Sequence, residues 1–253
     1  MTGLSKGHLW TVLVALLAVA GLPARAQTLD VVTEDSSYSY LQDGKVSGSA
    51  TDVVERVLQR AGLTDYRIGL YPWARAYDMA RLQPNVLIYP MMRLPERETG
   101  FHWIGELARV TPIFYRLRSR PEVQVASLDD ARRYAIGVVR GDSRALFLEG
   151  KGFMRLVVSA NDNDNFRKLL NGQIALLPMP EREARQRCHD LHVSCDEIEP
   201  AYTLHELSGG LYLAFSLDTP DDTVRRVREA FEQLKAEGTV ERLVGEVSTA
   251  TDR

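Results

Sequence analysis

Short runs of apolar residues alternate along the chain with segments whose apolar residues recur at helical spacing. The runs are typical of buried strands, and the helical spacing predicts helices that cover a sheet. In the first third, strands are expected over Leu29–Thr33, Tyr66–Leu70 and Val86–Tyr89, with helices between them over Ala50–Leu63 and Trp73–Leu82. This β-α-β-α-β order predicts a parallel sheet with helices on its faces.

The same alternation begins again in the second half of the chain and predicts a second, smaller α/β unit. Its expected strands are Tyr134–Val139, Leu156–Val158 and Ile174–Leu177, and its expected helices are Asn163–Leu170 and Glu181–Asp190. A further strand over Leu211–Phe215 and two helices, Thr223–Glu237 and a short one over 240–244, follow. Periodicity does not assign these C-terminal helices to either unit. Two such units predict a bilobal α/β protein with a cleft between the lobes. Ligands bind at the carboxyl ends of strands and at domain interfaces in such proteins.

The first 26 residues have the pattern of a secretory signal rather than of the fold. Lys6 precedes an apolar stretch of about 14 residues, Leu9–Leu22, and the small-residue site Ala24-Arg25-Ala26 follows. A membrane span needs roughly 20 residues, so an uncleaved N-terminal anchor is the weaker alternative. No cysteine follows the cleavage site that would carry a lipid. We therefore expect a periplasmic protein that is not lipid-anchored.

Composition and charge exclude several classes of protein. The 253 residues are 45% hydrophobic and 26% charged, which is unlike a disordered chain, a collagen-like fibre or a polytopic membrane protein. The formal net charge of −3 gives no electrostatic footprint for nucleic acid. We expect a monomer that needs no cofactor.

Cys188 and Cys195 are the only cysteines of the chain. In an oxidising compartment such a pair usually forms a disulfide. The alternative is a metal site that also uses His189 and His192, because Cys188 and His192 would share a helix face. Two free thiols are the third possibility. We predict the disulfide and no metal.

Five segments, taken in order, resemble the extracytoplasmic solute-binding proteins of family 3, which serve polar amino-acid ABC importers. These segments are Thr33–Tyr40, Met91–Gly105, Gly137–Ser143, Asn171–Ile174 and Phe231–Thr239. They match the family's N-terminal ligand loop, its strand-and-turn before an F-x-W-like segment, its G-V-x-x-G-T/S-T turn, its N-G-R-I-D element and its C-terminal helix. Each motif is weak alone, but together they cover nearly all of the chain after the signal.

The resemblance implies a type II periplasmic-binding-protein fold. Lobe 1 would comprise 27–112 plus 208–253, and lobe 2 would be the inserted block 113–207. Two crossing strands near Ile113–Leu117 and Leu204–Gly210 would form the hinge, and ligand capture would close the lobes.

The resemblance also suggests which residues bind the ligand. Arg97 matches the arginine that grips a ligand carboxylate, a role that suits a guanidinium in a buried cleft. Aromatic residues would wall the pocket, with Glu34 meeting a cationic group, and Asp142 and Ser143 would open a lobe 2 helix that suits an anion. The full expected set is Glu34, Tyr38, Tyr40, Trp73, Arg75, Met92, Arg97, Asp142, Ser143 and Arg144.

The sequence departs from the family at three positions. Pro90 and Met92 stand where small hydroxyl residues are common, and Ala175 replaces the Asp of N-G-R-I-D. No Asp occurs near Pro180, where the family commonly pairs the ligand ammonium, so Glu181 or Glu34 is the candidate replacement. An ordinary L-amino acid is therefore in doubt as the ligand.

The expected function is capture of a small polar or anionic ligand, amino-acid-like or carboxylate, for an ABC permease. One alternative is an enzyme on the same fold, similar to a periplasmic dehydratase, with Glu181 and His205 as the nearest acid/base candidates. Another is a sensory or accessory binding protein that serves no transporter. The sequence contains no G-x-S-x-G, HExxH or P-loop motif, and we expect binding without catalysis.

Overall fold

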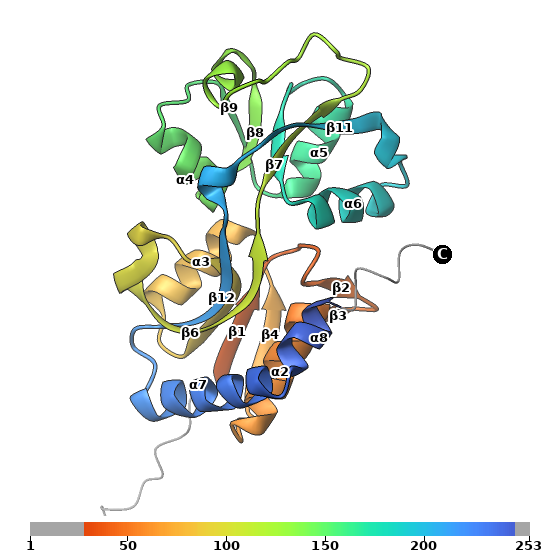
Figure 1. Cartoon of the computed structure of the whole chain (residues 1–253). Helices are drawn as coiled ribbons and strands as arrows, with labels where there is room; N and C mark the ends of the chain where they lie inside the picture. The colour runs from red at the N-terminus through yellow and green to blue at the C-terminus, as the bar shows by residue number, and fades with distance from the viewer. Residues whose placement is uncertain (1–27, 246–253) are drawn as a thin grey trace, which may run out of the picture.

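The protein is described from a computed structural model, which covers residues 28–245. The predicted signal segment lies outside the described residues. Within them, none of the helices has the length and apolar character needed to cross a membrane. Two groups of strands and helices, one above the other in Figure 1, make up the described chain, and we call them lobe 1 and lobe 2.

Lobe 1 is built on a five-stranded sheet of order β4-β1-β5-β12-β6 within residues 28–245. β1, β4 and β5 run parallel, as the β-α-β-α-β order predicted, and Val31 of β1 stands opposite Ile68 and Leu87. β12 pairs antiparallel with both β5 and β6. The strands are β1 (Leu29–Thr33), β4 (Tyr66–Leu70), β5 (Val86–Met92), β6 (Phe101–Val110) and β12 (Gly209–Ser216).

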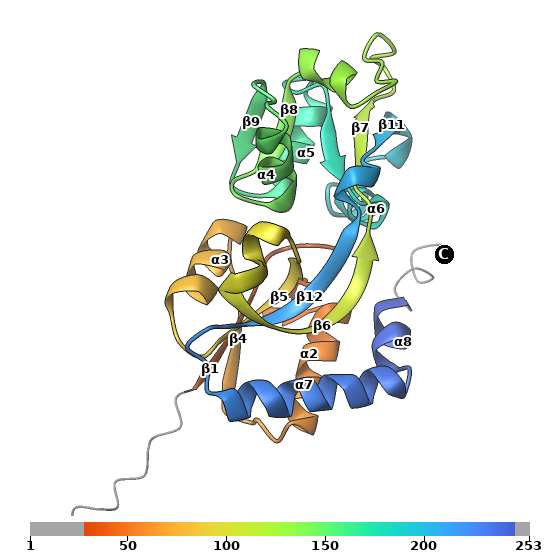
Figure 2. The same cartoon turned by 60° about the vertical axis from the view of Figure 1, so that its left-hand side comes forward.

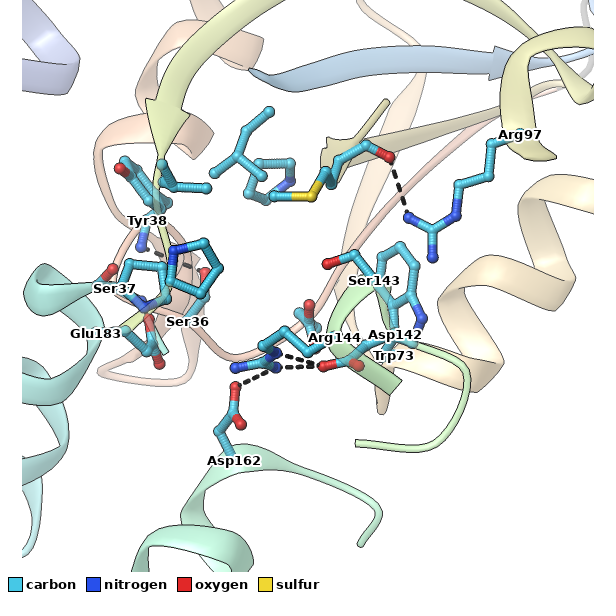
Figure 3. A pocket seen from close by; sticks show the side chains of 17 residues that line it. Ser36, Ser37, Tyr38, Trp73, Arg97, Asp142, Ser143, Arg144, Asp162 and Glu183 are labelled. Atoms are coloured by element: carbon cyan, nitrogen blue, oxygen red, sulfur yellow. Dashed lines mark hydrogen bonds and ion pairs between the residues drawn. The ribbon is translucent and has the colours of Figure 1, made fainter. Parts of the chain in front are cut away.

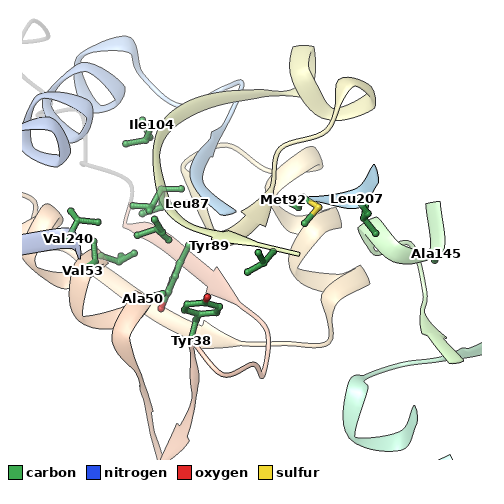
Figure 4. Packing of buried hydrophobic residues seen from close by; sticks show 14 of the residues in the cluster. Tyr38, Ala50, Val53, Leu87, Tyr89, Met92, Ile104, Ala145, Leu207 and Val240 are labelled. Carbon is green, nitrogen blue, oxygen red and sulfur yellow. The ribbon is translucent and has the colours of Figure 1, made fainter. Parts of the chain in front are cut away.

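Helices pack on this sheet and enclose the larger hydrophobic core. The predicted apolar stripe of α2 is buried, with Val54, Val57 and Leu58 at 0% exposure. Figure 4 shows these layers meeting around Val53, Leu87 and Val240. The helices of lobe 1 are α2 (Ser49–Arg60), α3 (Trp73–Leu82), α7 (Asp221–Ala236) and α8 (Thr239–Gly245).

Lobe 2 has a smaller core, in which α6 packs on a three-stranded sheet of order β10-β7-β11 in the described chain. β8 and β9 form a parallel pair beside it, joined by a bridge between Ile136 and Leu176. The strands are β7 (Ile113–Leu117), β8 (Ile136–Val139), β9 (Leu156–Ser159), β10 (Leu177–Met179) and β11 (Ile198–Thr203). The helices are α4 (Ser143–Gly150), α5 (Asp162–Leu170) and α6 (Glu181–Asp190).

Two connections join the lobes and lie side by side in both views (Figures 1 and 2). One runs from β6 into β7, and the other from β11 into β12. A hydrogen bond of 2.7 Å between the hydroxyls of Thr111 and Ser208 ties them together. The strand expected over Leu204–Gly210 is wrong in its first half, where His205–Leu207 form a 3₁₀ turn. Leu204 and Leu207 are both buried, and a three-residue spacing suits such a turn better than a strand.

Several further elements differ from the sequence prediction, among them β11, which was not expected. A short hairpin, β2 (Tyr40–Gln42) and β3 (Lys45–Ser47), occupies the polar stretch before α2. β6 is a full ten-residue strand. The strand expected over Ile174–Leu177 begins only at Leu177, because Leu176 contributes the isolated bridge to Ile136.

Candidate functional site

A cavity of about 100 Å³ lies where the two lobes face each other (Figure 3). Its walls come from the loop after β1, the end of β5 and the start of α3 in lobe 1, and from the N-terminal turns of α4, α5 and α6 in lobe 2. The residues that line it are Glu34, Ser36, Ser37, Tyr38, Trp73, Pro90, Met92, Arg97, Val110, Pro112, Asp142, Ser143, Arg144, Asp162, Pro180, Glu183 and Leu211.

Arg97 and Trp73 of lobe 1 both reach the backbone of lobe 2. The Trp73 indole Nε1 donates to the Gly141 carbonyl at 3.0 Å, and Arg97 Nη2 donates to the same oxygen at 3.3 Å. Arg97 Nη1 donates to the Met92 carbonyl at 3.1 Å, and the guanidinium lies over the rings of Trp73 and Tyr77. Burial lowers the pKa of Arg97. Its Nε is buried without a partner among the described residues.

Arg144 is held by two carboxylates of its own lobe. Its guanidinium lies 2.5 Å from Asp142 and 2.9 Å from Asp162, and it donates to the Pro178 carbonyl at 3.1 Å. Burial lowers the pKa of Arg144, but these two carboxylates outweigh that effect and raise it above its ordinary value. Asp142 also caps α4 by accepting from the Ala145 amide at 2.7 Å. Arg144 is thus an internally paired cation.

The inner face of α6 makes further contacts between the lobes, and Asn163 of α5 donates to Asp35 at 3.1 Å. The Glu183 carboxylate accepts from the Ser37 amide at 2.7 Å and pairs with Arg187 at 2.5 Å. Arg187, which is 1% exposed, also pairs with Asp35 at 2.7 Å. Arg182 donates to the Ser37 carbonyl at 3.1 Å. These ion pairs and hydrogen bonds join α6 to the loop after β1.

Glu34 differs from the other acids of the cavity because its carboxylate makes no hydrogen bond within residues 28–245; only its backbone carbonyl accepts one, from Thr33 Oγ1. Burial and the negative charges of Asp162, Asp142 and Glu183 raise the pKa of Glu34 to about 8, against the opposing charge of Arg144. The described lining holds four carboxyl groups and two guanidinium groups. Glu34 is therefore a carboxyl group without an ion pair in the described chain, and the charge of Arg144 offsets its acidic neighbours only in part.

The structure brings eight of the ten expected ligand-binding residues to this cavity. They are Glu34, Tyr38, Trp73, Met92, Arg97, Asp142, Ser143 and Arg144. Tyr40 begins β2 and does not line the cavity. Arg75 also lies outside the lining, with its guanidinium 4.7 Å from the centre of the Tyr71 ring.

Sequence reasoning missed Asp162, Glu183, Ser36 and Ser37. Asp162 and Glu183 stand in the first turns of α5 and α6, where acids favour the helix N-terminus. The i, i+4 spacing of Glu183 and Arg187 on a predicted helix could have indicated their ion pair from the sequence. Glu181, the acid proposed near that position, is 60% exposed and does not line the cavity.

The predicted disulfide between Cys188 and Cys195 is present, with a Cα–Cα distance of 5.5 Å. It joins the end of α6 to the segment before β11. Among residues 28–245, no group of three or more His, Cys, Asp or Glu residues is arranged to hold a metal ion.

Two lobes of this topology, joined by two adjacent connections with a polar cavity between them, define the type II periplasmic-binding-protein fold, as the resemblance implied. A histidine kinase sensor domain with similarity to periplasmic binding proteins has a TM-score of 0.77 at 15% identity, covering 87% of this chain and 95% of that one. A mutant of ArgBP from T. maritima has a TM-score of 0.74 at 13% identity, covering 87% and 94%. The arginine-, lysine-, histidine-binding protein ArtJ from Geobacillus stearothermophilus has a TM-score of 0.72 at 16% identity, with the same coverage.

These matches confirm, at the level of the fold, the resemblance to family-3 solute-binding proteins. No family model matches the sequence. No curated protein matches it either.

Proposed function

We propose that this protein is a periplasmic solute-binding protein that captures a small, amino-acid-like molecule bearing a cationic group between its lobes. The observation that carries the proposal is the carboxyl group of Glu34, half-buried in an acid-rich cavity and without an ion pair of its own in the described chain. A ligand ammonium or guanidinium would neutralise it. Without a ligand this group is mostly protonated at neutral pH. A bound cation would lower its pKa and favour the carboxylate, and the attraction between the two charges is stronger in a partly desolvated cavity than at the surface.

The ligand's carboxylate would bind Arg97, whose Nε has no partner in the described chain. Arg97 is 2% exposed, so a ligand reaches it only when the lobes separate. The hydrogen bond from Arg97 to the Gly141 carbonyl joins the lobes and would break on opening. Capture is thus a hinge motion, and the closed lobes would be presented to an ABC permease.

Several solved structures of this fold support the choice of ligand class. Two of these proteins are bound to arginine, and ArtJ is an arginine-, lysine-, histidine-binding protein. In this chain, the proposed ligand class is supported by Glu34 and its acidic neighbours, which suit a cationic group, and by the unpartnered Nε of Arg97, which suits a carboxylate. The proposed ligand is therefore a polar molecule that carries both a carboxylate and a cationic group.

Isothermal titration calorimetry with L-arginine and with L-citrulline tests the proposal. Citrulline has nearly the same shape and lacks the side-chain cation. We expect the wild-type protein to bind arginine at least tenfold more tightly, and Glu34→Gln to lose that preference. The control is Glu232→Gln on the exposed face of α7, which should behave as wild type. Equal affinity of wild type for both molecules, with or without binding of other amino acids, would contradict the cation site.

An enzyme is the second candidate, and the raised pKa of Glu34 is the observation that favours it. A carboxyl group with a pKa of about 8 is protonated at neutral pH and can act as a general acid. Incubating a bound ligand with the protein and analysing it by mass spectrometry separates the two functions. Consumption by the wild type and not by Glu34→Gln would select the enzyme, and full recovery of the ligand would select the binding protein.

A further inference from the structure

The two ends of the interlobe cavity differ in the charge that they offer a ligand. At one end lies Arg97, to which we assign the ligand's carboxylate. The acceptors that Arg97 touches there are the carbonyls of Met92 and Gly141, and Arg97 itself donates to both, at 3.1 and 3.3 Å. The Gly141 carbonyl also accepts from Trp73. A second cation beside that carboxylate would therefore meet carbonyls that are already engaged.

The side chains described at this end supply no free counter-charge. Pro90 and Met92 alternate on β5, so they point to the same face of the strand, and both line the cavity with apolar atoms. The Trp73 ring already holds the guanidinium of Arg97, which lies 4.9 Å from its centroid. Ser143, on the opposite lobe, contributes a neutral hydroxyl. An ammonium group placed here would lose its hydration without gaining a partner of opposite charge.

The lobe 2 carboxylates of the cavity are engaged within the protein, with one exception. Each oxygen of Asp142 accepts a hydrogen bond, one from the Ala145 amide at 2.7 Å and the other from Arg144 at 2.6 Å. Both oxygens of Glu183 also accept hydrogen bonds. Asp162 differs, because only its Oδ2 pairs with Arg144 (Figure 3), whereas its Oδ1 is buried with no partner within residues 28–245.

The unpartnered oxygen of Asp162 belongs to the other end of the cavity, where Glu34 lies. Burial raises the pKa of Glu34, and among the charged groups Asp162 adds most to this effect, ahead of Asp142 and Glu183. Because interactions between charges weaken with distance, Asp162 is the lobe 2 acid that faces Glu34 most closely. A cation between Glu34 and Asp162 would thus meet one carboxyl group from each lobe, neither of which is fully paired.

We propose that the ligand is an ω-guanidino or ω-amino carboxylate, with a carboxylate at one end, a cation at the other and no ammonium group beside the carboxylate. Its cation would lie between Glu34 and Oδ1 of Asp162. Its carboxylate would bind Arg97, and its methylene chain would pack on Met92. This inference rests on the proposed function and narrows it to the desamino relatives of basic amino acids. L-Arginine binds the same site more weakly, because its ammonium group is desolvated without a partner.

Isothermal titration calorimetry with δ-guanidinovalerate and L-arginine tests the inference, because these molecules differ only in the ammonium group next to the carboxylate. We expect wild type to bind δ-guanidinovalerate about tenfold more tightly. Equal affinities, or tighter binding of arginine, would overturn the inference, while a preference for arginine over citrulline would leave the proposed function standing. Equal binding of δ-guanidinovalerate and its uncharged analogue δ-ureidovalerate, or no binding of any of these molecules, would overturn both.

A pair of substitutions tests whether the missing counter-charge causes the preference. Ser143→Asp adds a carboxylate to the first turn of α4, where acids are favoured, and Ser143→Asn is a matched change without the charge. The preference for δ-guanidinovalerate over arginine should be about fivefold smaller in Ser143→Asp than in Ser143→Asn, the effect of a partly exposed ion pair. The same preference in both variants would show that the absent charge is not the cause.

Asp162→Asn tests the position of the ligand's cation. The variant should weaken binding of δ-guanidinovalerate about tenfold and affect δ-ureidovalerate much less, because only the first molecule carries a charge to pair with Asp162. An equal loss for the two molecules would contradict this placement, since it would show that Asp162 acts only by holding Arg144 in position.

Discussion

Replacing Glu34 with glutamine should stabilise the unliganded protein, and the gain should grow with pH. The pKa of Glu34 is raised from 4.5 to about 8 in the folded protein. Between these values the folded state holds a proton that the unfolded chain has lost, so the stability contributed by this group falls as pH rises. At 1.36 kcal/mol per pKa unit, the loss is about 3 kcal/mol at pH 7 and about 5 kcal/mol at pH 9, relative to pH 4. Glutamine carries no charge, so the Glu34→Gln variant does not lose this stability as pH rises.

Urea denaturation of wild type and Glu34→Gln at pH 4.5, 7 and 9 measures this directly. The difference in the free energy of unfolding should be small at pH 4.5, where Glu34 is protonated in the folded protein. It should increase at each step towards pH 9. The difference curve isolates Glu34, because Asp142 and the other cavity acids are common to both proteins. A difference that stays constant from pH 4.5 to 9, or that favours wild type at high pH, would refute the raised pKa.

Three further predictions concern the hinge and the packing. Trp73→Phe removes the indole hydrogen bond to Gly141, worth about 1 kcal/mol, so the closed form should become about fivefold less favoured. Small-angle X-ray scattering should then show a larger radius of gyration. An unchanged radius would show that this hydrogen bond does not hold the lobes closed. Reducing the disulfide Cys188–Cys195 should lower the free energy of unfolding by about 2–3 kcal/mol for so short a loop, and no change in urea midpoint under reductant would contradict this. Gly105→Ala would place a methyl group 2.0 Å from Phe231 and should lower the free energy of unfolding by about 1–3 kcal/mol. Gly150→Ala, with open space around it, is the control. Equal stability of the two variants would show that the core around Phe231 rearranges to admit the methyl group.

Much of the fold follows from local pattern. Strand Leu29–Thr33 and helices Trp73–Leu82 and Glu181–Asp190 have the bounds that periodicity predicted, because buried strands and one-sided helices leave strong signals. Strand Phe101–Val110 was seen only as a motif. It contains Gly105, and its buried and half-buried residues follow no regular alternation. Its length is set by pairing with β12 rather than by its own composition.

The site was harder to predict because its chemistry depends on contacts between the lobes. Arg97 could be named from its motif, but the sequence does not reveal that its Nη atoms bond to the carbonyls of Met92 and Gly141. The pairing of Arg144 with Asp142 and Asp162 joins residues up to 18 positions apart. Only the folded arrangement shows that these pairs leave Glu34 without an ion pair in the described chain.

Calorimetric titration of L-arginine at pH 7, in two buffers of different ionisation enthalpy, tests the cation site most directly. With a pKa of about 8, Glu34 is largely protonated before binding, and an adjacent cation lowers its pKa, so binding releases a proton. We predict release of close to one proton, roughly 0.9, per arginine by wild type and none by Glu34→Gln. A binding enthalpy that is the same in both buffers, or equal proton release by the two proteins, would contradict the placement of the ligand's cation at Glu34.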